Sequence, residues 1–199
     1  MLRRFDGDLL GANAMAHALA AAVRQTSANE IEDLVPGARS LLVRLRAGSE
    51  PSPALLAAIE ATPDPQRGED RPVVEVTVRY GGDDGPDLGD VARNAGLAEE
   101  EVIARHAVAT YTVGFIGFSP GFAYLLGLPE ELATPRLETP RTRIPAGSVA
   151  IGGAYTGVYP RATPGGWRLI GRTDRELFDP TRAPPTLLTP GDHVRFVQA

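Results

Sequence analysis

The chain has 199 residues, of which 43% are hydrophobic and 23% charged, and its formal net charge is −5. This is the composition of an ordinary globular protein, and the acidic balance argues against a nucleic-acid partner because phosphate binding leaves a basic footprint. The sequence has no cysteine, which excludes disulfides, a thiol nucleophile and thiolate metal ligands. All twenty basic residues are arginine, so this chain cannot form a lysine Schiff base, carry biotin or provide a P-loop lysine.

The sequence gives no sign of a membrane or secretory segment. No apolar run is long enough to span a bilayer, and the N-terminus lacks a basic stretch followed by an apolar stretch and a small-residue cleavage site. We therefore expect a cytoplasmic protein that has no contact with a membrane.

The first third of the chain predicts a small α+β domain. Asn13 is expected to cap a helix over residues 14–24, which are rich in alanine. Residues 39–46 are rich in Leu and Val and favour a strand. Residues 51–61 predict a short helix that begins at proline.

A linker is predicted after this domain. Residues 62–72 are proline-rich and charged and contain no large apolar side chain. This composition places a domain boundary there, with a first domain over residues 1–68 and a second over residues 69–199.

The second domain is expected to be rich in short strands. Residues 73–80 alternate β-branched side chains, which is typical of a strand. Residues 86–96 and 98–109 predict two short helices, the first ending at Gly96. From Gly114 to Gly171, glycines and prolines separate short apolar runs, which indicates a small barrel or sandwich. Residues 187–199 predict a tight turn and a closing strand.

Residues 117–121, "GFSPG", match the Gly-x-Ser-x-Gly pattern of a hydrolase nucleophile elbow. In that motif the backbone N–H of the residue after the serine helps to form the oxyanion hole. Here that residue is Pro120, which has no N–H. The only histidine downstream of Ser119 is His193, in the expected last strand. We therefore expect that Ser119 is not a nucleophile.

Aromatic residues surround this serine. Phe118, Phe122 and Tyr124 lie on a glycine-bearing turn with Pro120 between them. They suit a stacking wall for a small ligand or a partner, and the alternative is that they belong to the barrel core.

Arginine is concentrated in residues 134–173, which include Arg136, Arg141, Arg143 and Arg172. Pro140 and Pro145 bracket Arg141 and Arg143, so the segment should be extended and should present both guanidinium groups on one face. Guanidinium is suited to bidentate capture of carboxylate or phosphate. The alternative is a solvated basic face.

The remaining candidates for the functional site are three glycines, one serine and one histidine. Gly165 and Gly166, before Trp167, present backbone N–H groups that an anion could approach, or they form a barrel corner. Gly147 allows a similar approach, and Ser148 could donate one hydrogen bond. His106 is the general acid–base candidate by residue type, with a structural histidine as the alternative. The acidic turn at residues 81–87 lacks the spacing of a calcium loop, so no metal is expected.

Longer motifs carry a specific resemblance. The segments "YGGDDGPDL", "GFIGFSPGFAYLLGLP", "PRTRIPAGSVAIGGAYTGVYP", "TPGGWRLIGRT" and "TPGDHVRF" lie in this order within residues 73–196. They resemble the family of the 5-oxoprolinase B subunit, also labelled allophanate hydrolase subunit 1 or carboxyltransferase subdomain, which includes the KipI sensor-kinase inhibitor. The resemblance implies an α+β fold in which a small α+β N-terminal domain precedes a cyclophilin-like β-barrel.

The resemblance also implies partners and a reaction. Family members work with a related protein similar to allophanate hydrolase subunit 2, which we call the subunit 2-like partner. In 5-oxoprolinase a third protein, the LamB/YcsF-like partner, joins them. The assembly uses ATP to open the lactam of 5-oxoproline, a small carboxylate, to glutamate.

We expect this chain to be inactive alone, to bind no metal or biotin, and to have no ATP site that a motif identifies. Two other functions stay open for a member of this family. One is an inhibitor of a sensor histidine kinase, and the other is a carboxyltransferase component of a urea carboxylase-like system.

Residues and resemblance together predict the site. The catalytic candidate is His106, and the substrate group is Arg141, Arg143, Gly147, Ser148 and Tyr155. The pocket or partner surface consists of Phe118, Pro120, Phe122, Tyr124, Gly165, Gly166, Trp167 and Arg172.

The sequence departs from the family's pattern in three places. Tyr155 stands where many members have Gln, which puts in doubt any polar contact made by that Gln. Asp174 stands where proline is usual. The family's usual first strand is missing, so either the chain starts late or the N-terminal sheet is one strand short.

Overall fold

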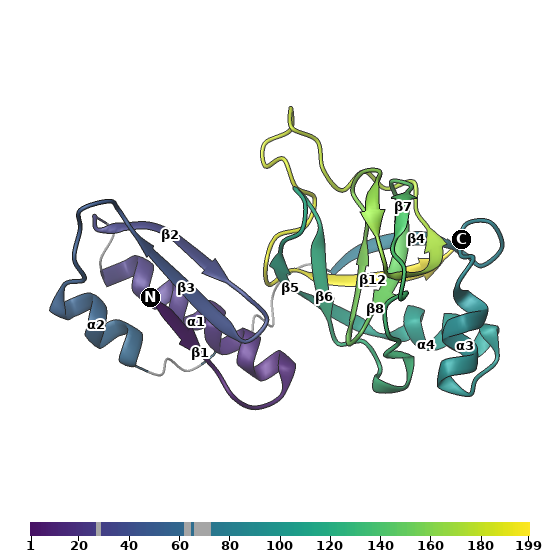
Figure 1. Cartoon of the computed structure of the whole chain (residues 1–199), viewed down its shortest axis with the longest axis horizontal. Coiled ribbons are helices and arrows are strands. Elements are labelled where there is room, and N and C mark those ends of the chain that lie inside the picture. The colour runs from purple at the N-terminus through teal and green to yellow at the C-terminus, as the bar shows by residue number, and fades with distance from the viewer. Residues whose placement is uncertain (27–28, 62–64, 66–72) are drawn as a thin grey trace. The chain divides into compact units, whose positions relative to one another are not determined.

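The computed structural model describes residues 1–26, 29–61, 65 and 73–199. The chain forms two compact units, Met1–Asp70 and Arg71–Ala199 (Figure 1). The predicted linker over residues 62–72 lies, except for Pro65, outside the described residues. None of the helices in the described part of the chain is both long and apolar enough to cross a membrane.

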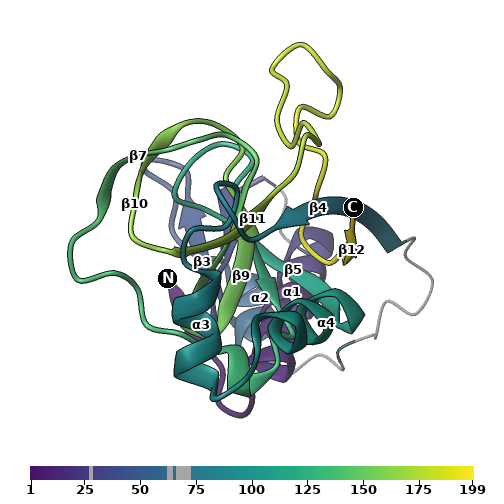
Figure 2. The ribbon, with the colours of Figure 1, turned by 90° about the vertical axis from the view of Figure 1, so that its right-hand side faces the viewer.

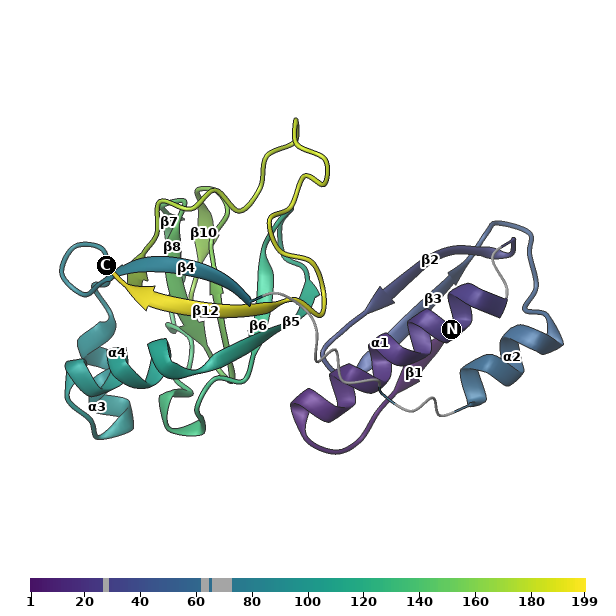
Figure 3. The ribbon, with the colours of Figure 1, turned by 180° about the vertical axis from the view of Figure 1, so that it is seen from behind.

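The N-terminal unit is a three-stranded antiparallel sheet with two helices. Its elements are β1 (Leu2–Arg4), α1 (Leu9–Thr26), β2 (Ile31–Pro36), β3 (Ser40–Leu45) and α2 (Pro53–Glu60). The strand order is β1-β3-β2. Both helices lie on one face of the sheet (Figure 3) and share a core that includes Leu19, Val23, Leu41 and Leu55. The predicted strand at residues 39–46 and helix at residues 51–61 are confirmed.

The predicted cap of α1 is wrong. The helix begins at Leu9, where the carboxylate of Asp8 accepts a hydrogen bond from the backbone N–H of Gly11 at 2.8 Å. Asn13 is buried in the helix, and its side-chain amide donates to the carbonyl oxygen of Gly37 at 2.9 Å. Asn13 therefore ties the helix to the turn between β2 and β3 instead of starting the helix.

The C-terminal unit is built on a closed barrel of seven strands in the order β11-β4-β12-β5-β6-β9-β8. Strands β4 and β12 pair in parallel, and the other barrel pairs are antiparallel. The elements are β4 (Val73–Tyr80), α3 (Leu88–Ala95), α4 (Glu99–Val108), β5 (Thr110–Ile116), β6 (Ala123–Leu126), a 3-10 turn (Glu130–Leu132), β7 (Arg141–Ile144), β8 (Ser148–Gly152), β9 (Tyr155–Val158), β10 (Thr163–Gly165), β11 (Arg168–Arg172) and β12 (His193–Gln198). The prediction of an α+β fold with a barrel is confirmed.

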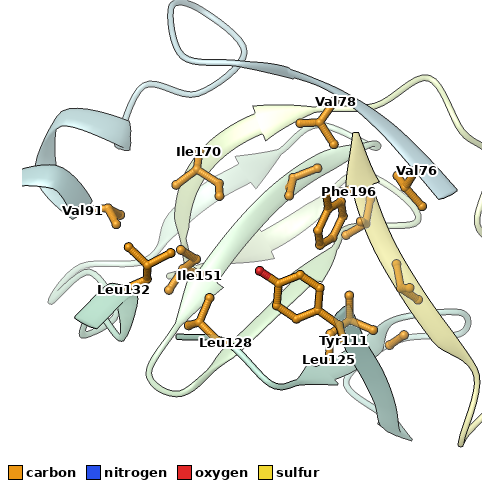
Figure 4. Packing of buried hydrophobic residues seen from close by; sticks show 14 of the residues in the cluster. Val76, Val78, Val91, Tyr111, Leu125, Leu128, Leu132, Ile151, Ile170 and Phe196 are labelled. Carbon is orange, nitrogen blue, oxygen red and sulfur yellow. The ribbon is translucent and has the colours of Figure 1, made fainter. Parts of the chain in front are cut away.

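Side chains from the barrel strands fill its interior. Figure 4 shows Tyr111, Leu125, Ile151, Ile170 and Phe196 pointing into it, and all of them are at most 1% exposed. Helices α3 and α4 connect β4 to β5, and α3 ends, as predicted, at Gly96 in the left-handed conformation with φ 67°.

Two features project from the barrel. Strands β7 and β10 form a separate two-stranded antiparallel sheet, and Figure 2 shows these strands side by side. The long connection between β11 and β12 forms a loop that extends away from the barrel. The two-stranded sheet carries Arg141 and Arg143. The long loop carries Phe178, which packs against Gly121 in the turn at residues 117–121.

Candidate functional site

The segment between β5 and β6 is a rigid turn, residues 117–121, which we call the Phe118 turn. The backbone N–H of Gly117 donates to the carbonyl of Phe122 at 3.1 Å, and that of Phe122 donates to the carbonyl of Ser119 at 3.0 Å. Phe118 has φ 64°, the only positive φ of a non-glycine residue in the described chain, and its side chain is 61% exposed. A bulky residue in this conformation costs about 1–3 kcal/mol, so the surrounding structure must impose it.

Ser119 has none of the surroundings of a nucleophile. Its hydroxyl oxygen is buried and has no hydrogen-bond partner among the described residues. No base is therefore within hydrogen-bond distance to take its proton, as a serine nucleophile requires. Pro120 follows it, without an N–H for an oxyanion hole.

We expect a fluorophosphonate probe to leave Ser119 unmodified, as intact-protein mass spectrometry would record. Ser119→Ala should keep the activity of the assembled complex, measured at saturating partner, within a few-fold. Stoichiometric labelling at Ser119 would show that this interpretation is wrong.

Seven aromatic side chains form one connected group, the aromatic cluster. Its members are Phe115, Phe118, Phe122, Tyr124, Tyr155, Tyr159 and Trp167. Phe122, Tyr159 and Trp167 are at most 4% exposed and belong to the hydrophobic core. Tyr124 and Tyr155 are half-buried, and Phe118 is exposed. The predicted surface role therefore fits Phe118 and the half-buried tyrosines better than Phe122 or Trp167.

Glycines make room for the rings of this cluster. A Cβ at Gly152 would lie 2.5 Å from the indole of Trp167, and one at Gly165 would lie 2.5 Å from the hydroxyl of Tyr159. The carbonyl of Gly166 accepts from the N–H of Leu137 at 2.7 Å. Packing thus accounts for Gly165 without a bound anion, as in the barrel-corner alternative, whereas a Cβ at Gly166 would make only ordinary contacts at 3.5 Å and beyond.

Burial controls the ionisation of Tyr159. It raises the pKa of this phenol to about 12, and the backbone of Trp167 offsets the rise only in part. The hydroxyl is therefore neutral at physiological pH. The guanidinium of Arg136 lies 5.7 Å from the centre of the Trp167 ring, in the range of a cation–π contact.

Arg141 is committed to an internal ion pair. Its two terminal nitrogens donate to the two carboxylate oxygens of Asp87 at 2.9 and 2.7 Å. The side chain of Asp87 is 6% exposed, and it also accepts from the N–H of Leu169 at 2.7 Å. The bidentate geometry expected for substrate capture is present, but the carboxylate belongs to the protein, so this contact does not support a substrate role for Arg141.

Arg143 differs from Arg141 although both lie on β7. It is exposed and has no ion-pair or hydrogen-bond partner among the described residues. Arg172 is half-buried and lies near Asp174, whose pKa is lowered mainly by its hydrogen bond to Arg79 and to a smaller extent by Arg172. Arg143 is therefore the predicted substrate-group arginine that is available to bind an anion.

Gly147 and Ser148 are enclosed by the protein. Gly147 has φ 80°, and a Cβ there would approach the carbonyl oxygen of Thr173 to well under 3.0 Å. Its N–H donates to the carbonyl of Tyr159 at 2.8 Å, and its carbonyl accepts from the N–H of Thr173 at 2.9 Å. Ser148 is 3% exposed. The close approach expected at Gly147 is real, but the group that approaches is the Thr173 backbone, so packing explains both residues.

His106 lies in the barrel interior and is fully buried. Its Nε2 is 2.9 Å from the hydroxyl of Thr156, and its Nδ1 is 2.8 Å from that of Tyr80. Thr156 donates to the carbonyl of Ala150, so it accepts from Nε2–H, and Nδ1 accepts from Tyr80. Burial lowers the pKa of His106 to about 3. A neutral, enclosed ring does not support the general acid–base prediction and fits the structural alternative.

Tyr155 lies on β9 at the edge of the aromatic cluster, with its ring 5.6 Å from Tyr124. No group of three or more His, Cys, Asp or Glu side chains in the described residues could hold a metal ion.

Asp87, the partner of Arg141, was not found from the sequence, because 54 residues separate the two. The only feature of the sequence that could have indicated a role for Asp87 is its position between a turn and α3.

Comparison with known proteins identifies the family. Residues 6–188 match the family described as carboxyltransferase domain, subdomain C and D. The 5-oxoprolinase B subunit of Escherichia coli O157:H7 is 49% identical in an alignment of 173 residues that covers 84% of this chain and 78% of that protein.

Two solved structures have the same fold. TTHA0988 superposes with a TM-score of 0.85 at 38% identity; the match covers all of this chain but only 39% of the TTHA0988 chain. The conserved uncharacterized protein PH0987 from Pyrococcus horikoshii superposes with a TM-score of 0.64 at 40% identity, over 100% of this chain and 93% of that one. Together with the sequence matches, these similarities show that the chain belongs to the 5-oxoprolinase B subunit family of carboxyltransferase-domain proteins.

Proposed function

We propose that this chain is the B subunit of an ATP-dependent complex that opens the lactam of 5-oxoproline to glutamate. The complex works in the cytoplasm, and this chain has no activity without its partners. The observation that carries the proposal is the 49% identity to the E. coli 5-oxoprolinase B subunit over 78% of that protein. Its two partners would be the subunit 2-like partner and the LamB/YcsF-like partner.

Residues at the surface of the C-terminal unit support a contributing role in a shared site. Exposed Arg143 offers a guanidinium for the carboxylate of 5-oxoproline. Tyr155 and Tyr124 offer half-buried ring faces for its apolar methylene groups. We propose that ATP binds elsewhere in the complex, since the lysine-free chain has no P-loop lysine.

A carboxyltransferase is the second candidate, and the description of the matching family favours it. In that case the biotin would be carried by another protein, because this chain has no lysine.

Two assays of the reconstituted complex distinguish the 5-oxoprolinase from the carboxyltransferase. The chain would be combined with both purified partners, and glutamate release from 5-oxoproline would be measured with and without ATP. A parallel assay would follow carboxyl transfer from a carboxybiotin carrier to urea. ATP-dependent glutamate release supports the proposal. Transfer to urea without glutamate release would favour the carboxyltransferase.

Arg143→Lys is expected to lower kcat/KM of the reconstituted complex for 5-oxoproline about 10-fold or more, equivalent to about 1.4 kcal/mol. Lysine keeps the charge but loses the planar fork that binds a carboxylate through two hydrogen bonds. The measurement is steady-state kinetics at saturating partner. An exposed arginine without a ligand would tolerate the change, so unchanged kinetics would assign Arg143 to the solvated surface.

A further inference from the structure

The Phe118 turn has a feature that the proposed substrate contacts do not use. Phe118 is the one exposed aromatic side chain among the described residues. Its ring contacts are with Phe122 and Tyr159, at centroid distances of 5.4 and 6.3 Å, and both of these rings are buried. The rest of the Phe118 ring faces solvent.

Backbone hydrogen bonds fix the conformation of the turn that carries this ring. Three backbone hydrogen bonds close it, including one from the N–H of Ser119 to the carbonyl of Gly117 at 2.6 Å. Phe178, from the loop between β11 and β12, lies directly behind it, where a Cβ at Gly121 would come within 2.6 Å of the Cβ of Phe178. A rigidly presented aromatic loses little conformational freedom when it binds, which is typical of an interface anchor.

Two neighbouring residues of the turn have features that cost free energy in the unbound chain. Phe118 has a left-handed backbone conformation at φ 64°, and the hydroxyl of Ser119 is buried without a partner among the described residues. Such features cluster where a structure is completed by something else. A partner that covers the ring would bury apolar surface, which offsets the cost of the Phe118 conformation.

The surroundings favour a protein partner over a small carboxylate. The ring of Phe118 packs on Phe122, which is 1% exposed, and on Tyr159, which is 2% exposed. These ring contacts of Phe118 include no cation. A small carboxylate needs an enclosed site with a countercharge, whereas a protein interface needs an aromatic centre with a polar rim.

We propose that the Phe118 turn is the docking contact for the subunit 2-like partner, with the ring of Phe118 inserted into an apolar pocket of that protein. The choice of occupant rests on the proposed function. It is also supported by TTHA0988, in which the counterpart of this chain makes up 39% of one longer polypeptide. Further sequence is therefore joined to the same fold in that relative, as a covalently attached partner would be.

The test is the dissociation constant between this chain and the purified subunit 2-like partner, measured by titration calorimetry without 5-oxoproline or ATP. Phe118→Ala is expected to weaken binding at least about 10-fold, as for a central aromatic anchor. Phe118→Gly, which accepts the positive φ, should weaken binding equally and shows that the ring, not the backbone, is responsible. The matched control is Val108→Ala, because Val108 is 79% exposed at the end of α4, and it should bind like the wild type.

Three results would overturn the docking proposal itself. Wild-type affinity in both Phe118 variants would do so. Unchanged affinity with lost activity at saturating partner would assign Phe118 to the substrate site. A dimer of this chain that Phe118→Ala dissociates, seen by sedimentation velocity, would make a second copy the occupant. If the pair binds through Phe118 but releases no glutamate with the LamB/YcsF-like partner and ATP, the proposed function fails and the docking contact stands.

Discussion

Gly147→Ala is expected to destabilise the barrel by about 2–5 kcal/mol. The left-handed conformation costs an alanine about 1–2 kcal/mol, and Gly147 has φ 80°. The new methyl group would also overlap the carbonyl oxygen of Thr173, and relieving such an overlap in packed structure costs about 1–3 kcal/mol or more. Urea unfolding followed by fluorescence of Trp167 measures this effect in the barrel, because Trp167 is the only tryptophan of the chain.

Gly153→Ala is the matched control for this prediction. Gly153 also has a positive φ, 63°, but a Cβ there would meet no atom within 4 Å. Alanine at this position should therefore cost only about 1–2 kcal/mol. If Gly147→Ala were as stable as Gly153→Ala and only the activity of the complex fell, a ligand, not Thr173, would be the group that Gly147 admits.

Arg141→Ala is expected to cost about 3 kcal/mol of unfolding free energy. The substitution leaves the nearly buried carboxylate of Asp87 without its guanidinium, and breaking a buried ion pair from one side costs about 3–5 kcal/mol. The lower end applies because the N–H of Leu169 still donates to Asp87. The same Trp167 fluorescence assay measures the change.

Arg143→Ala provides the contrast on the same strand. Arg143 is exposed and has no partner in the described part of the chain, so its loss should change stability by no more than about 0.5 kcal/mol. Equal stability of the two alanine variants would contradict the assignment of Arg141 to structure and Arg143 to binding.

Local signals in the sequence predicted most of the C-terminal unit. The alternation over residues 73–80 became β4, and short apolar runs between turn residues, such as Ser148–Gly152, became barrel strands. Two strands of the N-terminal unit were not predicted. β1 is only three residues long, and the pairing of β2 shifts register between Ile31 and Asp33, so neither strand has a regular two-residue alternation.

The roles of the candidate site residues were harder to predict from the sequence than the fold, because they depend on contacts between residues that are far apart in the chain. The sequence placed Arg141 and Arg143 on one strand, but only the fold brings Asp87 against Arg141. His106 is a helical histidine in the sequence, and its burial depends on Thr156 and Tyr80 from two barrel strands. Similarly, Gly147 was predicted to let an anion approach the backbone, whereas the Thr173 backbone, which lies there in the fold, could be identified only in three dimensions.

Omission of one protein at a time tests the central claim that this chain is a dependent subunit of a 5-oxoprolinase-type complex. ATP-dependent glutamate release from 5-oxoproline would be measured for the chain alone, for its two partners without it, and for the three together. We predict release only when all three are present. Release by the chain alone at the rate of the full mixture, or an equal rate from the two partners without it, would contradict the claim.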